Sequence, residues 1–430
     1  MLEKLFGIEK AGTSVKTELL AGLATFLTMA YITVVNPAIL SSDGTGMAFG
    51  AVFTATIIAA MVGTLIMGLW ANWPVALAPG MGLNAFFTFG VIFGMGYTYQ
   101  QALAAVFVAG VVFIALSVTP ARKYIINSIP RSMKLGVGAG IGLFLAIIGL
   151  KNAGVVVDHP ATLVGLGDVA SVPVLLAGLG FAIMAILDKR GVPGSVIIGI
   201  LATSIIAWVT GVAEMGGVAG AIPSPEHAFS LDFSMLATAG FIGVAFAFLF
   251  VDFFDTAGTL TSVANLTGKV NKDGEVDGID RAVLADSVAT SVGALAGTSN
   301  TTSYIESGAG IKEGGRTGLT AVTVAVLFGA CLFFAPLAQS IPAFATGAAL
   351  VFIATYFLRN IADIAWDDVT EYAPAVLAAV LMPLTFSIAH GIALGFIAYA
   401  VIKALSGRQE DLNAGSIAIA LVSVIYFLAV

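Results

Sequence analysis

Asp252, Asp255 and Glu306 are carboxylic acids within the predicted membrane segments of this 430-residue chain, where ionisable side chains are rare. Asp252 and Asp255 lie three residues apart in VDFFDTAGTL, so they share one face of a helix. Glu306 lies in TSNTTSYIESGAG, a run built mainly of Thr, Ser, Asn and Gly. A carboxylate at membrane depth costs ~2.5–3.5 kcal/mol on insertion scales and normally faces the interior of a helix bundle. We therefore expect these acids to bind a ligand or to carry a proton.

The surroundings of these acids limit the ligand that they can hold. No basic partner is predicted beside the acids, so an anion would be repelled, whereas a cation or a neutral molecule rich in N–H donors fits. A buried carboxyl group can take up a proton near neutral pH, so one acid can carry a proton while the other holds the ligand. Structural roles stay open. In a purely structural role, Asp252 would cap the N-terminus of a half-helix or pair with an Arg of a cytoplasmic loop. Glu306 would then accept hydrogen bonds from Thr and Ser hydroxyls.

The composition predicts that these acids belong to a polytopic helical membrane protein. Hydrophobic residues make up 59% of the chain and charged residues 10%, against roughly 25% charged in soluble domains. The single cysteine, Cys331, excludes an intrachain disulfide and a thiolate metal cluster. The three histidines are far apart in sequence, so no His-based metal site and no resident cofactor are expected. No basic patch indicates nucleic acid, and no cleavable signal peptide is evident before the first apolar run.

The apolar runs predict fourteen segments in a lipid bilayer. Basic residues fall in the loops that are cytoplasmic if the N-terminus is cytoplasmic, and the longest external loop, 213–234, has none. Both ends of a fourteen-segment chain are then cytoplasmic. The apolar tail 414–430 is an extra span or a helix packed on the bundle. The segments are 17–40, 49–70, 75–94, 101–118, 135–150, 172–187, 195–212, 236–260, 282–296, 298–318, 319–338, 346–358, 373–387 and 391–405. The cytoplasmic basic residues are Arg122, Lys123, Arg131, Lys134, Lys189, Arg190, Lys269, Lys272, Arg281, Lys312, Arg316, Lys403 and Arg408.

The third and tenth segments are predicted to be broken. Pro79, Gly80 and Gly82 weaken a helix around Asn84, and the first half of 298–318 is too polar for a lipid-facing helix. Irregular backbone at membrane depth is tolerated only where protein buries it or where it lines a cavity. Asn84 either meets a ligand or forms a helix–helix hydrogen bond. Tyr31 of the first segment and Tyr304 of the tenth either stack on a planar ligand or pack in the core.

An internal repeat relates the two halves of the chain. The tripeptide SIP occurs at 128–130 and at 340–342, each time before an apolar span that ends in a basic residue and Asn. The two broken segments are also seven segments apart, and an odd spacing gives the halves opposite orientation. Inverted repeats with paired discontinuous segments place a substrate site near the middle of the bilayer.

Several long motifs, in this order along the chain, resemble one family. They are TELLAGLATFLTMAYITVVNPAIL at 17–40, PGMGLNAFF at 79–87, VDFFDTAGTL at 251–260, TSNTTSYIESGAG at 298–310, EGGRTGLTA at 313–321 and FSIAHGIALGFI at 386–397. Together they resemble the AzgA-like branch of the nucleobase–ascorbate transporter (nucleobase:cation symporter) family. The resemblance implies a secondary active transporter, not an enzyme. It would import adenine, guanine and hypoxanthine by proton symport across the plasma membrane, with the proton as the coupling ion.

The resemblance also implies an all-α fold of seven plus seven inverted segments. A core domain would comprise 14–118 and 236–338, and a gate domain would comprise 119–212 and 339–430, with the external loop at 213–235. The core would move against the gate during transport, and the gate would form a homodimer.

By the family pattern, Asp255 and Glu306 match the two substrate-binding acids, and both are candidates for proton coupling. Asp252 matches no family position but is a third candidate for proton coupling. The other residues expected at the substrate are Thr28, Tyr31, Asn84, Ala85, Phe86, Tyr304 and Ile305, those at 85–86 and 304–305 through their backbone.

Three other functions remain open from the sequence alone. An anion transporter or channel of the same general fold would have to hold its ligand beside two acids. An intramembrane enzyme would need a nucleophile–base pair or a metal cluster, which the scattered histidines do not supply. Sodium coupling would use Asp252, Asp255 and nearby hydroxyl oxygens as ligands.

Overall fold

The computed structural model describes residues 2–119, 129–270 and 276–429. Within these residues, nine helices are long and apolar enough to cross a membrane. The predicted segments all correspond to helices or to broken helices, several of them a few residues longer than expected. Three basic residues used to predict orientation, Arg122, Lys123 and Lys272, lie outside the described residues, as does Ser128 of the repeat.

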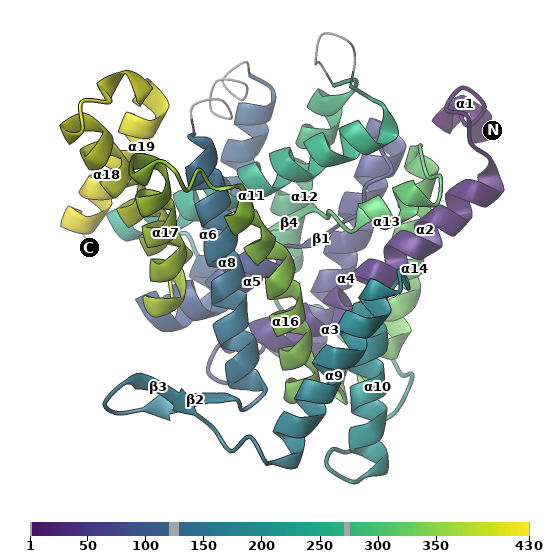
Figure 1. The fold of residues 1–430 in the computed structure, drawn as a ribbon. Helices are drawn as coiled ribbons and strands as arrows, with labels where there is room; N and C mark the ends of the chain where they lie inside the picture. The colour runs from purple at the N-terminus through teal and green to yellow at the C-terminus, as the bar shows by residue number, and fades with distance from the viewer. Residues whose placement is uncertain (1, 120–128, 271–275, 430) are drawn as a thin grey trace.

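The first group of helices surrounds two short strands near the centre of the molecule (Figure 1). In this group α14 packs on α2 and α4, α12 packs on α4 and α6, and α11 packs on α6. The elements of its first half are α2 (Val15–Met29), α3 (Ile32–Leu40), α4 (Phe49–Ile66), η1 (Met67–Ala71), β1 (Leu77–Pro79), α5 (Met81–Ala85), η2 (Phe86–Gly94) and α6 (Tyr99–Ser117). Those of its second half are α11 (Ala239–Thr267), α12 (Ile279–Ala296), β4 (Thr301–Ser303), α13 (Ser307–Lys312), α14 (Gly318–Cys331), η3 (Leu332–Phe334) and α15 (Ala335–Gln339).

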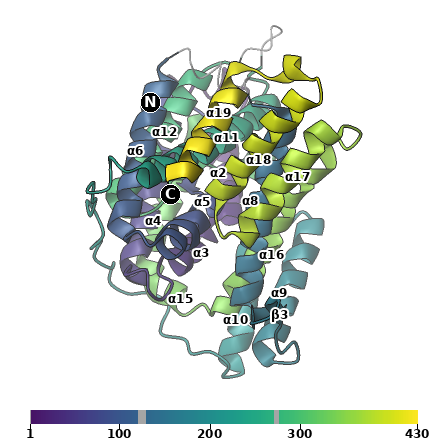
Figure 2. The ribbon, with the colours of Figure 1, turned by 90° about the vertical axis from the view of Figure 1, so that its left-hand side faces the viewer.

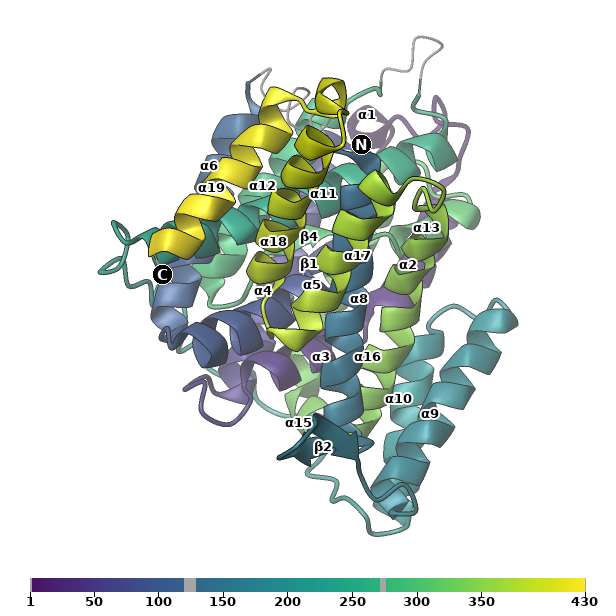
Figure 3. The same ribbon diagram turned by 60° about the vertical axis from the view of Figure 1, so that its left-hand side comes forward.

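The second group is built around α8, which packs on α16 and α17, as Figure 3 shows. Small residues allow the close approach of these helices, since a Cβ at Gly149 would lie 2.7 Å from the Gly347 carbonyl oxygen. The elements are α8 (Arg131–Asn152), α9 (Val172–Lys189), α10 (Ser195–Val209), α16 (Ala343–Leu358), η4 (Arg359–Asp363), α17 (Val369–Leu384), α18 (Ile388–Leu405), η5 (Gln409–Asp411) and α19 (Ala414–Ala429). An exposed hairpin, β2 (Val156–His159) and β3 (Leu163–Leu166), follows α8, and a short helix, α1 (Leu2–Phe6), begins the chain.

The loop between α10 and α11 lies across one end of the first group. His227 is buried there, and its Nε2 accepts a hydrogen bond of 2.9 Å from the backbone N–H of Ala48, just before α4. Burial lowers the pKa of His227, although the nearby charge of Glu226 acts in the opposite direction. The loop is therefore held to α4 by a neutral imidazole.

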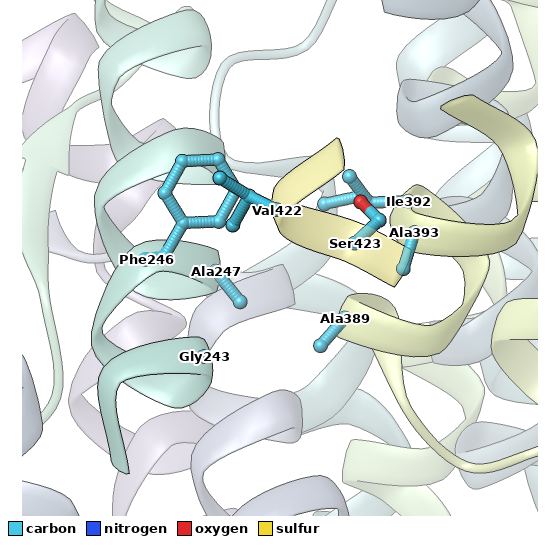
Figure 4. A pocket seen from close by; sticks show the side chains of 8 residues that line it. All are labelled: Gly243, Phe246, Ala247, Ala389, Ile392, Ala393, Val422 and Ser423. Carbon is cyan, nitrogen blue, oxygen red and sulfur yellow. The ribbon is translucent and has the colours of Figure 1, made fainter. Parts of the chain in front are cut away.

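The apolar tail forms α19, which packs on α18 and on α11 (Figure 2). It thus contacts both groups of helices. A small apolar cavity of about 30 Å³ remains beneath it, as Figure 4 shows. The lining residues are Gly243, Phe246, Ala247, Ala389, Ile392, Ala393, Val422 and Ser423.

Candidate functional site

The two broken segments meet as a pair of antiparallel strands, β1 and β4. Ala78 lies opposite Thr302, and Pro79 lies opposite Thr301. The pairing continues at both ends, because the Gly80 N–H donates to the Asn300 carbonyl at 2.9 Å and the Tyr304 N–H donates to the Ala76 carbonyl at 3.0 Å. All six strand residues are buried. Each broken segment thus satisfies the backbone of the other at a depth where water is absent.

Two buried carboxylates hold β4 in place from the side of α11 and α12. Asp286 accepts hydrogen bonds from the backbone N–H of Ser303 at 2.7 Å and from the Thr256 hydroxyl at 2.7 Å. Asp252 accepts the Thr290 hydroxyl at 2.6 Å and the Asn300 amide at 3.1 Å. These acids therefore position the polar strand from behind.

Asp286 is a buried acid of the site that is absent from the predicted site residues. The residue is the fifth in the predicted ninth segment, 282–296, and an ionisable residue inside an apolar segment is the same signal that singled out Asp252. The signal is weaker at Asp286, because the surrounding segment also carries Ser and Thr and contains no Pro to indicate a break. The structure shows that this acid is completely buried and that it reaches Ser303 of β4.

Asp255 lies on the same helix as Asp252, but it lines an open cavity of about 390 Å³. Its side chain is exposed there, although Asp252, one helical turn earlier, is 1% exposed. The two acids share a helix face as expected, but they meet different surroundings. The lining residues of the cavity come from α8, α11 and α16, and they are Lys134, Val137, Gly138, Ile141, Val251, Phe254, Asp255, Ala257, Gly258, Thr261 and Phe357.

Glu306 lies between β4 and α13 and is hydrogen-bonded to the first helix pair. Its Oε1 accepts a hydrogen bond of 2.8 Å from the Tyr31 hydroxyl, at the break between α2 and α3. The Thr28 hydroxyl is 3.4 Å from the Glu306 carbonyl oxygen. The structure therefore brings Glu306 together with Thr28 and Tyr31, whereas Asp255 lines a cavity whose described lining residues do not include Glu306.

The hydroxyl groups of Tyr31 and Tyr304, the two aromatic residues considered for stacking, both donate hydrogen bonds within the protein. Tyr31 is 1% exposed, and Tyr304 is buried with its hydroxyl donating to the Pro79 carbonyl oxygen. Asn84 is also buried; it accepts a hydrogen bond from the Ser299 hydroxyl and donates to the Pro79 carbonyl at 3.4 Å. These contacts tie β1 and α5 to the second broken segment.

The remaining predicted site residues fall into two surroundings. Ala85 and Phe86 are completely buried, and the Phe86 ring packs edge-on against Phe248. The Phe86 N–H is already used in the helix, where it bonds to the Gly82 carbonyl. Ile305, in contrast, is 51% exposed beside Glu306.

Among the described residues, no group of three or more His, Cys, Asp or Glu side chains is arranged to hold a metal ion. The groups that donate hydrogen bonds to Asp252 and Asp286 are instead hydroxyl, amide and backbone N–H groups. Donors of this kind suit a carboxylate rather than a cation.

Comparison with known proteins decides the family. A family model described as a permease family matches residues 16–394. The chain belongs to this family. The predicted membership of the nucleobase–ascorbate transporter family is thus confirmed, and this permease is an integral membrane transporter, not an enzyme.

Curated relatives of this permease match it over nearly its whole length. The adenine permease AdeP of Escherichia coli (strain K12) is 42% identical over 426 residues, covering 99% of this chain and 95% of AdeP. The guanine/hypoxanthine permease PbuO of Bacillus subtilis (strain 168) is 44% identical over 418 residues, covering 95% of this chain and 96% of PbuO.

A solved structure confirms the predicted fold. The transmembrane domain of the cyanobacterial bicarbonate transporter BicA superposes with a TM-score of 0.67 at 16% identity. The match covers 87% of this chain and 96% of that domain. This permease therefore has the seven-plus-seven inverted-repeat fold, with the two broken segments paired at its centre.

Proposed function

We propose that this permease imports purine nucleobases by proton symport. The observation that carries the proposal is the exposure of Asp255 in an open cavity, with Glu306 held by Tyr31 beside the paired broken segments. The names of the relatives, adenine permease and guanine/hypoxanthine permease, point to the same class of ligand.

A purine suits these acids chemically. Its ring N–H and exocyclic amino groups donate hydrogen bonds, and ionised carboxylates only accept them. The cavity volume of about 390 Å³ lies within the range of ~300–1,000 Å³ that small-molecule sites occupy. A neutral base avoids the charge repulsion that an anion would meet between two acids.

Proton coupling follows if the ligand and a proton stabilise the pair of acids together. Two neighbouring carboxylates resist being ionised at the same time, because like charges disfavour each other. Protonation of one acid leaves the other ionised to accept the N–H groups of the base. We assign this pair to Asp255 and Glu306, with Asp252 as a third proton-carrying candidate because its Oδ1 has no hydrogen-bond partner among the described residues.

For the transport step, we propose that the first group of helices is the core and the second group is the gate. The core would comprise 14–118 and 236–338, and the gate 119–212 and 339–430, with an external loop at 213–235. Movement of core against gate would open the cavity beside Asp255 alternately to the two sides of the plasma membrane. Further proposals are an AzgA-like identity, a homodimer formed by the gate, and cytoplasmic termini.

One specific observation favours a second function, since BicA, which shares the fold, is named as a bicarbonate transporter. Asp255, which is exposed in the cavity, counts against an anion. Sodium coupling is separated from proton coupling by measuring uptake with and without Na⁺ at fixed pH.

Uptake of radiolabelled hypoxanthine into proteoliposomes with an imposed inward proton gradient tests the proposal. We expect accumulation that a protonophore abolishes and that adenine or guanine, but not uracil or sulfate, competes away. Absence of purine uptake, or inhibition by sulfate alone, would overturn the proposal and favour an anion substrate.

A further inference from the structure

Asp252 and Asn300 share one hydrogen bond behind β4, and each side chain has a second oxygen that lacks a partner. Asp252 is 1% exposed, and Asn300 is completely buried. The Asn300 amide donates to Asp252 Oδ2 at 3.1 Å. Asp252 Oδ1 and Asn300 Oδ1, in contrast, have no hydrogen-bond partner among the described residues. One pair of side chains thus contains two buried acceptors and no donor for either of them.

An ionised Asp252 would be poorly stabilised in this place. None of the ion pairs formed within the described parts of the chain includes Asp252. Its two donors, the Thr290 hydroxyl at 2.6 Å and the Asn300 amide, both reach the same oxygen, Oδ2. A buried charge that is neither paired nor fully hydrogen-bonded is strongly disfavoured. The hydrogen bonds of Asp252 therefore favour a neutral side chain.

Asp286, the other buried acid behind β4, has a different set of partners. Its two oxygens accept hydrogen bonds from the Ser303 N–H, the Ser303 hydroxyl and the Thr256 hydroxyl. Such a set suits an ionised carboxylate, which only accepts. Asp252 and Asp286 hold neighbouring residues of one polar segment, and like charges close together disfavour ionisation of both. Of the two acids, the hydrogen bonds favour Asp286 as the ionised one.

We propose that Asp252 is protonated and forms a cyclic acid–amide pair with Asn300, in which Asp252 Oδ1–H donates to Asn300 Oδ1. A protonated carboxyl group carries one O–H donor and still accepts at its other oxygen, and a primary amide likewise donates and accepts. A single proton therefore gives both unpartnered oxygens a hydrogen bond. This proton stays in the protein, so Asp252 is a positioning residue.

The pair fixes the place where the two broken segments meet. The backbone carbonyl of Asn300 accepts a hydrogen bond of 2.9 Å from the Gly80 N–H, which follows β1. The Thr290 hydroxyl, which contacts Asp252, also lies 3.1 Å from the Thr301 carbonyl oxygen at the start of β4. A neutral Asp252 thus holds the polar segment against α11 without placing a second charge behind it.

This inference narrows the proposed function, and it rests on that function only in excluding Asp252 from proton exchange. Asp255, one helical turn later on α11, is exposed in the cavity, where water can deliver or remove a proton. Asp252 is closed off from water by comparison. Proton exchange during transport is then left to Asp255 and Glu306.

Asp252→Asn tests whether the acid is neutral, because it places an amide where the protonated carboxyl group stands. The new amide can donate to Asn300 Oδ1 and accept at its own oxygen, so the unfolding temperature should stay at the wild-type value. The ratio of protons to purines in proteoliposomes should also be unchanged. Loss of purine-driven proton uptake in this variant would overturn the inference, because Asp252 would then carry the transported proton.

Asp286→Asn is the matched control, because it makes the same exchange at the other buried acid. Its amino group would lie among donors, so its unfolding temperature should fall below that of Asp252→Asn. Equally lowered unfolding temperatures in the two variants would overturn the inference.

Exchange of the two partners provides a second test. Asn300→Asp alone brings two acids together and should lower purine uptake by about tenfold or more. The double variant Asp252→Asn/Asn300→Asp restores one acid and one amide, so it should recover uptake to within about threefold of the wild-type rate. Absence of any recovery in the double variant would contradict an acid–amide pair.

Infrared difference spectroscopy of the purified protein reads the protonation state itself. The wild-type spectrum minus that of Asp252→Asn should contain the C=O stretching band of a protonated carboxyl group at neutral pH, and addition of hypoxanthine should leave this band in place. Carboxylate bands instead of this band would overturn the inference. Failure of the proposed function is distinct, since the wild-type protein would then take up no purine while the infrared band and the unfolding temperatures would be as predicted.

Discussion

The Tyr31 hydroxyl donates a hydrogen bond of 2.8 Å to the Glu306 carboxylate, although the two residues are 275 positions apart in the chain. The contact joins the break between α2 and α3 to the end of β4. Glu306 is thereby held in one orientation before any ligand binds.

Tyr31→Phe should weaken substrate binding while leaving the fold intact. A hydrogen bond to a charged group contributes about 1.5–3 kcal/mol, so the KM for the purine should rise about tenfold or more. Uptake kinetics measure this effect, with Tyr372→Phe as the control, because Tyr372 stacks on Trp366 away from the site. A KM within twofold of the wild-type value in Tyr31→Phe would show that this contact does not position Glu306 for binding.

Asp255→Ala should abolish purine binding, because it removes the acid that is exposed in the cavity. Equilibrium binding to the purified protein is the direct measurement, since it does not depend on coupling. Asp255→Asn, which keeps the shape and adds a donor, should also bind poorly. Normal binding by Asp255→Ala would move the ligand site elsewhere, to Asp252.

Asp286→Ala should destabilise the protein rather than change its selectivity. The substitution leaves the Ser303 N–H, the Ser303 hydroxyl and the Thr256 hydroxyl without their common acceptor in a buried place. Each unsatisfied buried donor costs about 1–3 kcal/mol, so the loss should be about 3 kcal/mol or more. Thermal unfolding in detergent measures it, and Asp43→Ala, at an exposed position, is the control. Equal unfolding midpoints for the two variants would show that Asp286 does not hold β4 in place.

Acidification should loosen the loop that contains His227. The pKa of His227 is lowered by burial, whereas the unfolded chain has a pKa of about 6.5. The stabilising contribution of the neutral imidazole is therefore fully present above about pH 6.5 and is lost as the pH falls through the folded-state pKa. The unfolding temperature should therefore decrease as the pH is lowered below about 6.5. His227→Gln, whose side-chain oxygen can accept a hydrogen bond from the Ala48 N–H, should show a weaker dependence of the unfolding temperature on pH. An identical pH profile in the variant would assign the dependence to other groups.

The sequence allowed the broken segments to be predicted because their cause is local. Pro79 and the neighbouring glycines weaken a continuous helix through their own backbone properties, and the Thr- and Ser-rich run around Thr301 is too polar for lipid. The antiparallel pairing of β1 with β4 joins residues more than two hundred positions apart, so it depends on the tertiary fold.

The separate surroundings of Asp252 and Asp255 could not be predicted from the sequence. Their spacing places them on one helix face, but a face is wide enough to meet both a strand and a cavity. The sequence places Lys134 only in a cytoplasmic basic stretch, because its place in the cavity depends on where α8 lies relative to α11. These assignments require the positions of neighbouring helices, which local patterns do not contain.

The most direct test of proton symport is the proton flux that a purine drives by itself. Hypoxanthine is added outside proteoliposomes that contain a pH-sensitive dye, with no imposed gradient. We predict acidification of the interior with the wild-type protein and none with Glu306→Gln, which keeps the size of the side chain but removes its charge. Hypoxanthine uptake without acidification in the wild-type protein, or unchanged acidification in Glu306→Gln, would contradict the account.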